Sequence, residues 1–237
     1  MVQKVLITGG NKGIGFESAR KLGKLGWHIL LGARNEQRGT AAVEKLEQEG
    51  ITAEWIHIDL NDLATIHAAA QYVTEHHTDL NVLINNAGIP GKMDATPLEV
   101  TADELKSVID VNIIGNFEMI KTFTPILAVN KGTILNLTIP SKSSHFFHPF
   151  SYTASKSSLN SMIRMFGQYY KKKHIPINIF GLMPGGITTD LNNHMKGFYM
   201  RTVDQGAQTV VNVLTDKRNY NGKVIFRFTP FTLFNKK

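Results

Sequence analysis

Two residues that could transfer a proton, Tyr152 and Lys156, lie four positions apart in the stretch "SYTASK". On a helix this spacing places both side chains on one face. A nearby ammonium group lowers the pKa of a phenol from about 10 toward neutral pH, where the phenol can exchange a proton with a substrate. The same spacing also fits an ordinary amphipathic helix, so this chemistry depends on the elements around it.

Short apolar runs alternate with longer helical patterns along the 237 residues. The runs show little polar alternation, which indicates strands that are covered on both faces. The predicted strands are 4–9, 28–33, 54–60, 81–88, 132–138, 177–183 and 222–228. The sequence therefore predicts an α/β fold with one doubly wound, mostly parallel seven-stranded sheet (a Rossmann fold), in a single domain over residues 1–237.

Three helical segments carry recognisable end signals. The segment 35–50 stops at Gly50, and the segment 61–77 opens on Asn61 as its N-cap. A third segment opens on Thr101 with Glu104 three residues later, the pattern of a capping box. In a fold of this type ligands bind beyond the carboxyl ends of the strands, so the functional residues are expected in the loops that follow them.

The composition excludes several classes of protein and site. Hydrophobic residues make up 42% of the chain, and there is no cysteine for a disulfide, a thiolate metal site or a nucleophile. No signal pattern and no apolar run of membrane-spanning length is present, so a soluble cytoplasmic protein is expected. The net charge of +7 is spread along the chain apart from "KKKH" at 171–174. This pattern predicts no nucleic-acid binding and fits an anionic small ligand, and the lone pair His145 and His148 predicts no metal site.

A glycine-rich turn, "TGGNKGIG" at 8–15, follows the first predicted strand and opens a helix. This arrangement predicts that backbone amides bind the pyrophosphate of a dinucleotide. The second strand ends in Ala33 and Arg34, with no carboxylate for a ribose hydroxyl, so a 2′-phosphate and hence NADP(H) is the predicted cofactor. The alternative is that Lys12 and Arg34 are solvated surface charges. The residues predicted to bind phosphates are Gly9, Asn11, Lys12, Gly13, Ile14, Gly15 and Arg34.

With these motifs in place, the chain resembles the short-chain dehydrogenase/reductase family over nearly its whole length. The family's motifs occur in order as "TGGNKGIG" at 8–15, "NNAG" at 85–88, "DVN" at 110–112, "YTASK" at 152–156 and "PGGITT" at 184–189. The glycine motif, "GARNEQRG" and "LINNAGI" are most similar to the NADPH-dependent carbonyl reductases of this family. The resemblance implies further cofactor contacts by Asp59, Leu60, Asn86, Ala87, Gly88, Tyr152, Lys156, Pro184, Gly185, Ile187 and Thr189.

The resemblance also implies four catalytic positions, of which three match: Asn112, Tyr152 and Lys156. The fourth is a serine thirteen positions before the tyrosine, where this chain has Ile139. Loss of such a hydrogen-bond donor costs about 3–4 kcal/mol, or about 10²–10³ in rate. Ser141 is the preferred substitute because Pro140 can turn its hydroxyl inward. Strand alternation would point Thr138 the other way, and each loop serine also fits a solvated role.

Two segments are expected beside the substrate. Phe146, Phe147 and Phe150 would form an apolar wall, unless they pack in the core. A substrate loop at about 190–203 carries Met195, Phe198, Tyr199 and Met200, which fit either a lid or a dimer contact.

The sequence therefore predicts an NADPH-dependent reductase of ketones or aldehydes, with Tyr152 as the proton donor to a small carbonyl substrate (or acceptor from an alcohol). Because of Ile139, the alternative is a catalytically weakened NADPH-binding protein with a regulatory or structural role. A nucleic-acid-binding protein with the same fold is a third hypothesis that rests on charge alone. By analogy with the family, a homodimer or homotetramer is expected.

Overall fold

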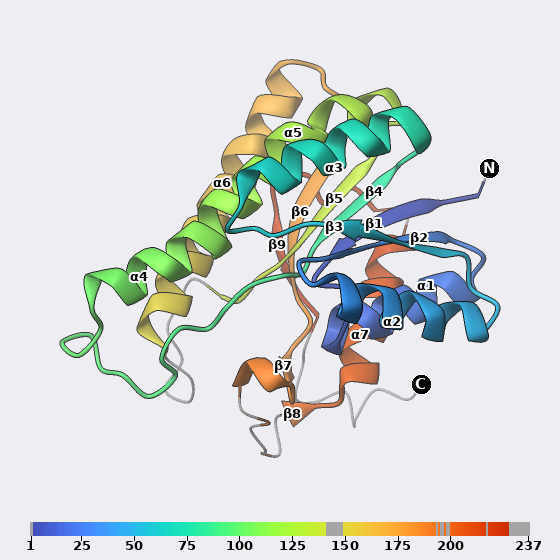
Figure 1. Ribbon diagram of the computed structural model, residues 1–237. Helices are drawn as coiled ribbons and strands as arrows, with labels where there is room; N and C mark the ends of the chain where they lie inside the picture. Colours follow the sequence, from blue (N-terminus) through green and yellow to red (C-terminus); the bar gives the residue numbers. More distant parts are fainter. Residues whose placement is uncertain are drawn as a thin grey trace, which may run out of the picture.

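A computed structural model describes residues 2–140, 149–192, 194, 197, 200–216 and 218–227. Seven parallel strands form one sheet in the order β3-β2-β1-β4-β5-β6-β9 (Figure 1). The strands are β1 Lys4–Thr8, β2 His28–Ala33, β3 Ala53–His57, β4 Val82–Asn85, β5 Thr133–Leu137, β6 Asn178–Met183 and β9 Val224–Phe226. The predicted α/β fold class with a seven-stranded sheet is confirmed, and all seven strands of the sheet are parallel.

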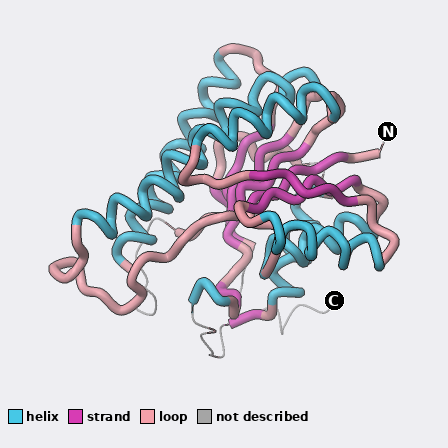
Figure 2. The backbone as a smooth tube through the Cα atoms, viewed as in Figure 1, coloured by secondary structure: helices cyan, strands magenta, loops and turns pink. Residues whose placement is uncertain are grey.

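Helices cover both faces of this sheet (Figures 1 and 2). One layer contains α1 Gly13–Lys24, α2 Glu36–Gln48 and α7 Val203–Leu214, and the other contains α3 Leu63–His76, α5 Asn116–Val129 and α6 Phe150–Lys172. Because strand side chains alternate, β1 feeds two cores: Leu6 packs in one, and Val5 and Ile7 pack in the other. No helix in the described ranges has the length and apolar character needed to cross a membrane.

Two helix starts differ from the sequence prediction. Helix α3 is capped by Asp62, whose Oδ1 accepts from the Ala64 amide at 3.1 Å, so the predicted cap at Asn61 is wrong by one residue. Thr101 accepts from the amide of Glu104 at 3.2 Å. The carboxylate of Glu104 does not complete a capping box, because it bonds the loop after β4 and the start of α6 instead.

The segment predicted as one helix from Thr101 contains a π-helical stretch. Helix α4 (Ala102–Ile109) leads into the π-helix η1 (Asp110–Gly115), which leads directly into α5. The Asn116 amide group donates to the carbonyls of Val111 and Asn112 at 3.3 and 3.1 Å, which supports this wider turn. A Cβ at Gly115 would lie 2.4 Å from a carbonyl oxygen of the segment after β3, so the close approach requires glycine there. A π-helical stretch often marks a functional site.

The loops after β1 and β4 are bonded to each other. The hydroxyl of Thr8 accepts from the amides of Asn86 and Ala87, each at 3.1 Å. The Asn86 side chain donates back to the carbonyls of Thr8 and Gly9 at 2.9 and 3.1 Å. The chains that leave β1 and β4 cover opposite faces of the sheet, and an α/β sheet opens its ligand crevice at such a point.

At the opposite end of the sheet, the amino ends of β1 and β2 meet a polar cluster. Lys4 is 9% exposed, and its Nζ contacts Asp79 at 2.6 Å and donates to His77 Nδ1 at 3.1 Å. His28 stands edge-on to His77, with ring centroids 5.6 Å apart. Burial lowers the pKa of His28, and the positive charge of Lys4 lowers it further, followed by a smaller effect of His77. Neutral His28 is therefore the form that the folded protein favours.

We predict that the free energy of unfolding falls as the pH drops below about 6.5, the pKa of an unperturbed histidine. Below that pH the unfolded chain gains a proton that folded His28 binds only at lower pH. The slope contributed by His28 should be well under the about 1.4 kcal/mol per pH unit of one full proton, because solvent screens a half-buried ring. Urea unfolding between pH 5 and 7.5 measures it, and His28→Gln should remove this part of the slope. An identical slope in the variant would contradict the assignment.

Candidate active site

A cavity of about 1050 Å³ lies at the carboxyl ends of the strands. Loops after β1, β2, β3, β4, β5 and β6 contribute to its wall, together with the first turn of α6. Its volume is at the upper end of the range for small-molecule sites. Of the predicted cofactor residues, those that line it are Gly9, Asn11, Lys12, Gly13, Ile14, Arg34, Asp59, Leu60, Asn86, Ala87, Gly88, Tyr152, Lys156, Pro184, Gly185, Ile187 and Thr189.

Of the glycine-turn residues that were predicted to bind the cofactor, only Gly15 does not line the cavity. Gly9 and Gly13 have φ values of 63° and 58°, a conformation that favours glycine, and both border the cavity. Gly15 lies behind them, where an added Cβ would be 2.5 Å from Nδ2 of Asn86 and 2.6 Å from the carbonyl oxygen of Gly9. Gly15 therefore has a packing role that lets α1 start directly beneath the turn, and its contact with the cofactor stays a prediction.

The two predicted phosphate-binding cations are in different situations. Within the described part of the chain the Arg34 guanidinium is exposed at the cavity wall and has no hydrogen-bond or ion-pair partner. The ammonium of Lys12 lies 2.6 Å from Oδ2 of Asp190, on the opposite wall. Asp190 belongs to the short helix η2 (Asp190–Asn192) and also lines the cavity. Sequence reasoning did not single out Asp190, because 178 residues separate it from Lys12.

Tyr152 and Lys156 share one face of α6 at the cavity. Lys156 is 3% exposed, and its Nζ donates to the carbonyl of Leu137 at 2.8 Å and lies 5.6 Å from the centre of the Tyr152 ring. Burial lowers the pKa of Lys156 to about 8 and raises the pKa of Tyr152 to about 12. The prediction that the ammonium lowers the pKa of the phenol is wrong for this structure, because desolvation outweighs charge attraction. Tyr152 therefore keeps its proton at neutral pH.

Asn112, in the π-helix η1, is fully buried and does not border the cavity in the described part of the chain. Its Oδ1 accepts from the amide of Ile89 at 2.9 Å, and its Nδ2 donates to the Ile89 carbonyl and the Ser155 hydroxyl at 2.8 and 3.0 Å. A Cβ added at Gly88 would be 3.0 Å from Oδ1 of Asn112 and 3.7 Å from Nζ of Lys156. Asn112 thus connects the loop after β4 to α6.

The end of β5 presents Ile139 to the cavity. The hydroxyl of Thr138 donates to Oδ1 of Asn160 at 2.8 Å, and Nδ2 of Asn160 donates to the carbonyl of Ile139 at 2.9 Å. The Thr138 hydroxyl is therefore held against α6, and Thr138 lines the cavity beside Ile139, so the prediction that it points away from the site is wrong. Ser141, the predicted substitute donor, lies outside the described residues, as do Ser143 and Ser144.

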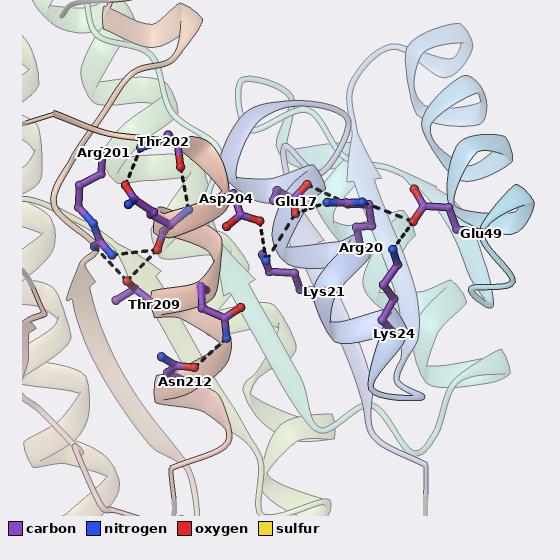
Figure 3. A network of polar contacts seen from close by, with 12 residues as sticks. Glu17, Arg20, Lys21, Lys24, Glu49, Arg201, Thr202, Asp204, Thr209 and Asn212 are labelled. Carbon is purple, nitrogen blue, oxygen red and sulfur yellow. Dashed lines mark hydrogen bonds and ion pairs between the residues drawn. The ribbon is translucent and has the colours of Figure 1, made fainter. Parts of the chain in front are cut away.

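The predicted substrate loop lies next to a pair of short strands. Strand β7 (Gly186–Ile187) pairs with β8 (Met200–Arg201), and Met200 lines the cavity. The guanidinium of Arg201 donates to the Thr209 hydroxyl at 3.0 Å and to the Gln205 carbonyl at 3.1 Å (Figure 3). It also donates to the Pro184 carbonyl. Arg201 therefore fastens the loop after β6 to α7, a role that no local sequence pattern indicated. Of the predicted wall and lid residues, Phe146, Phe147, Met195, Phe198 and Tyr199 lie outside the described residues, as do His145 and His148.

A family model for short chain dehydrogenases matches residues 3–198. A short-chain dehydrogenase, anuI, from Penicillium roqueforti (strain FM164) is 29% identical over 90% of this chain and 88% of its own length. Human carbonyl reductase [NADPH] 1 is 29% identical over 79% of this chain and 72% of its own length.

Solved structures agree with these relatives. An NADPH-bound carbonyl reductase from chicken fatty liver superimposes with a TM-score of 0.85 and 26% identity, over 95% of this chain and 96% of that one. A metagenomic short-chain oxidoreductase in complex with NADP gives a TM-score of 0.79 and 27% identity, over 96% and 97%. The resemblance that the motifs carry is thus shown over most of the chain. With a family model matched from the first strand to beyond the Tyr152–Lys156 helix, the chain belongs to the short chain dehydrogenase family and is an oxidoreductase.

Proposed function

We propose that this protein is an NADPH-dependent reductase of ketones or aldehydes, and that the reaction is reversible. The observation that carries the proposal is one cavity lined by the glycine turn, by Arg34 and by the Tyr152–Lys156 pair. NADPH, when bound, supplies the hydride that reduces the carbonyl carbon. Tyr152 donates its proton to the carbonyl oxygen, which gives the alcohol and balances the charge.

The residues present fit this cofactor. The positive φ of Gly9 and Gly13 brings backbone amides close to the place of a pyrophosphate. Arg34 offers an unoccupied guanidinium at the end of β2 within the described chain, where a 2′-phosphate needs a cation and a ribose hydroxyl would need an acid. The names of the relatives, carbonyl reductase [NADPH] and an NADPH-bound reductase, also support NADP(H).

The protonation states suit the reductive direction. Burial keeps the phenol of Tyr152 protonated, which is the form that can donate to a carbonyl oxygen. Lys156, with a pKa of about 8, is mostly charged at neutral pH and can stabilise the phenolate that proton transfer leaves behind. We propose that Asn112 holds a water molecule that connects Lys156 to solvent, because Oδ1 of Asn112 and Nζ of Lys156 both lie within 4 Å of the position that a Cβ of Gly88 would take.

A second candidate function is supported by Ile139. Its side chain borders the cavity at the family's serine position, and the neighbouring Thr138 hydroxyl is held by Asn160. A site with this arrangement fits an NADPH-binding protein with weak catalysis and a regulatory or structural role. Ser141 remains the proposed substitute donor for the reductase.

We propose that the protein acts on a small carbonyl or alcohol substrate as a homodimer or homotetramer. Met165 and Tyr169 on α6 are 68% and 51% exposed, which supports a contact between copies along this helix. A cytoplasmic location, a single cofactor-binding domain over 1–237 and a substrate loop at about 190–203 are part of the same proposal.

Tyr152→Phe should lower kcat/KM for carbonyl reduction by about 10²–10⁴, because the proton donor is removed. NADPH binding should persist, since most cavity contacts remain. NADPH absorbance with a panel of ketones and aldehydes measures turnover, and NADPH fluorescence measures binding. Tyr72→Phe, at an exposed tyrosine of α3 that does not line the cavity, is the matched control. Turnover of Tyr152→Phe at the parent rate would exclude Tyr152 as the donor.

The pH profile of the reduction should report Lys156. We expect kcat/KM to be steady from pH 6 to 7.5 and to fall above pH 8, where Lys156 loses its proton. Lys156→Arg should show a lower maximum but a decline displaced to higher pH, because arginine stays charged. A parent profile that stays level to pH 10 would show that the charge on Lys156 is not needed.

Ile139→Ser separates the two candidate functions. For a reductase, we expect the parent to consume NADPH and the added hydroxyl to raise kcat/KM by up to about 10²–10³. Ile139→Val keeps an apolar side chain and should behave like the parent. A parent that binds NADPH and consumes none with the whole carbonyl panel would support the binding protein instead, most clearly if Ile139→Ser gains turnover.

A further inference from the structure

A carboxylate faces the proposed phosphate-binding side of the cavity. Asp190 Oδ2 lies 2.6 Å from Nζ of Lys12, and the side chains are 55% and 62% exposed. Lys12 is the N-cap residue of α1, whereas Asp190 follows the loop that carries Pro184 and Thr189. Both line the cavity, so this ion pair connects its two walls.

The other two acids that line the cavity have partners of their own. Glu17 accepts from Arg20 at 2.7 and 2.9 Å on α1 (Figure 3). Asp59 accepts from the amide of Asn61 at 3.0 Å. Neither is seen to engage Lys12 or Arg34 in the described part of the chain. Asp190 differs because it bonds Lys12, which the sequence predicts to bind a phosphate of the cofactor.

The ion pair keeps Asp190 charged. Lys12, through its hydrogen bond and its charge, lowers the pKa of the Asp190 carboxyl below its usual value. His194 gives Asp190 a second contact, with Nε2 3.1 Å from Oδ1. Asp190 therefore retains a partner when the Lys12 side chain turns away, which makes the exchange of Lys12 between two anions feasible.

We infer that Asp190 is a specificity-determining residue that competes with the 2′-phosphate of the cofactor for Lys12. The inference rests on the proposed NADPH-binding function. A dinucleotide without the phosphate leaves the Lys12–Asp190 pair in place, whereas the phosphorylated form must take Lys12 from Asp190. The carboxylate thus reduces the preference for NADPH over NADH, and Arg34, which has no partner in the described chain, remains the cation available without exchange.

The test is a titration of the full-length protein with NADPH and with NADH, followed by nucleotide fluorescence at low and high salt. Asp190→Asn should bind NADPH about two- to fivefold more tightly, as expected for release of an exposed ion pair, and should change NADH binding less. The gain should shrink at high salt. In a Lys12→Met background the same substitution should leave the ratio of the two affinities unchanged, because the competition has been removed.

Glu49→Gln is the matched control. Glu49 contacts Lys24 at 2.6 Å, the same distance as in the Lys12–Asp190 pair, and Arg20 at 3.5 Å (Figure 3). Neither Glu49 nor Lys24 lines the cavity. Glu49→Gln removes one negative charge, as Asp190→Asn does. The affinities of this variant for NADPH and for NADH should equal those of the parent protein. Turnover is not needed for any of these measurements.

Three results would overturn the inference while leaving NADPH binding intact. If Asp190→Asn lowered the affinities for NADPH and NADH equally, the ion pair would stabilise either bound dinucleotide and would not compete with the 2′-phosphate. Unchanged affinities would make it a surface contact. Equal tightening with and without Lys12 would indicate general charge repulsion. A parent protein that binds neither dinucleotide would contradict the proposed function itself, and this inference with it.

Discussion

The hydrogen bonds between the loops after β1 and β4 are the constraint on which the site depends. Thr8 accepts from two amides of the "NNAG" segment, and Asn86 donates back to the glycine turn. These bonds hold open the crevice between two strands whose chains depart to opposite faces of the sheet. Gly15 completes the arrangement, because a side chain there would collide with the Asn86 amide. The position of the turn relative to Tyr152 follows from this junction.

At the Tyr152–Lys156 pair, burial rather than charge pairing sets the two pKa values. Lys156 is removed from water without a carboxylate partner among the described residues, and its Nζ donates to the backbone carbonyl of Leu137. Such an ammonium is costly to bury, so its pKa falls, whereas burial of the phenol raises the pKa of Tyr152. Tyr152 therefore keeps its proton, whereas Lys156 titrates near physiological pH. Such a separation of two pKa values is typical of acid–base sites.

The sequence was informative where the signal is local. Apolar runs predicted all seven strands, and the glycine turn and the Tyr152–Lys156 spacing indicated which loops line the cavity. Helix capping was less certain, because Asn61 and Asp62 are equally good N-cap residues and Glu104 found tertiary partners instead of the helix start. Asp190, Arg201 and Asn160 could not be predicted, since their partners are distant in the sequence. The altered pKa of Tyr152 depends on burial, which only the folded chain reveals.

The small ladder between β7 and β8 has a consequence for how this protein can vary. Gly186 and Ile187 pair with Met200 and Arg201, and the amide of Thr188 donates to the Arg201 carbonyl at 3.1 Å. The two ends of the segment between β7 and β8 therefore lie side by side, and Arg201 fixes them to α7. Residues inserted or deleted between these strands change the length of a loop whose ends are fixed. The entropic cost of closing such a loop grows slowly with its length. The length of this segment can therefore vary while the sheet, the glycine turn and the tyrosine helix keep their positions.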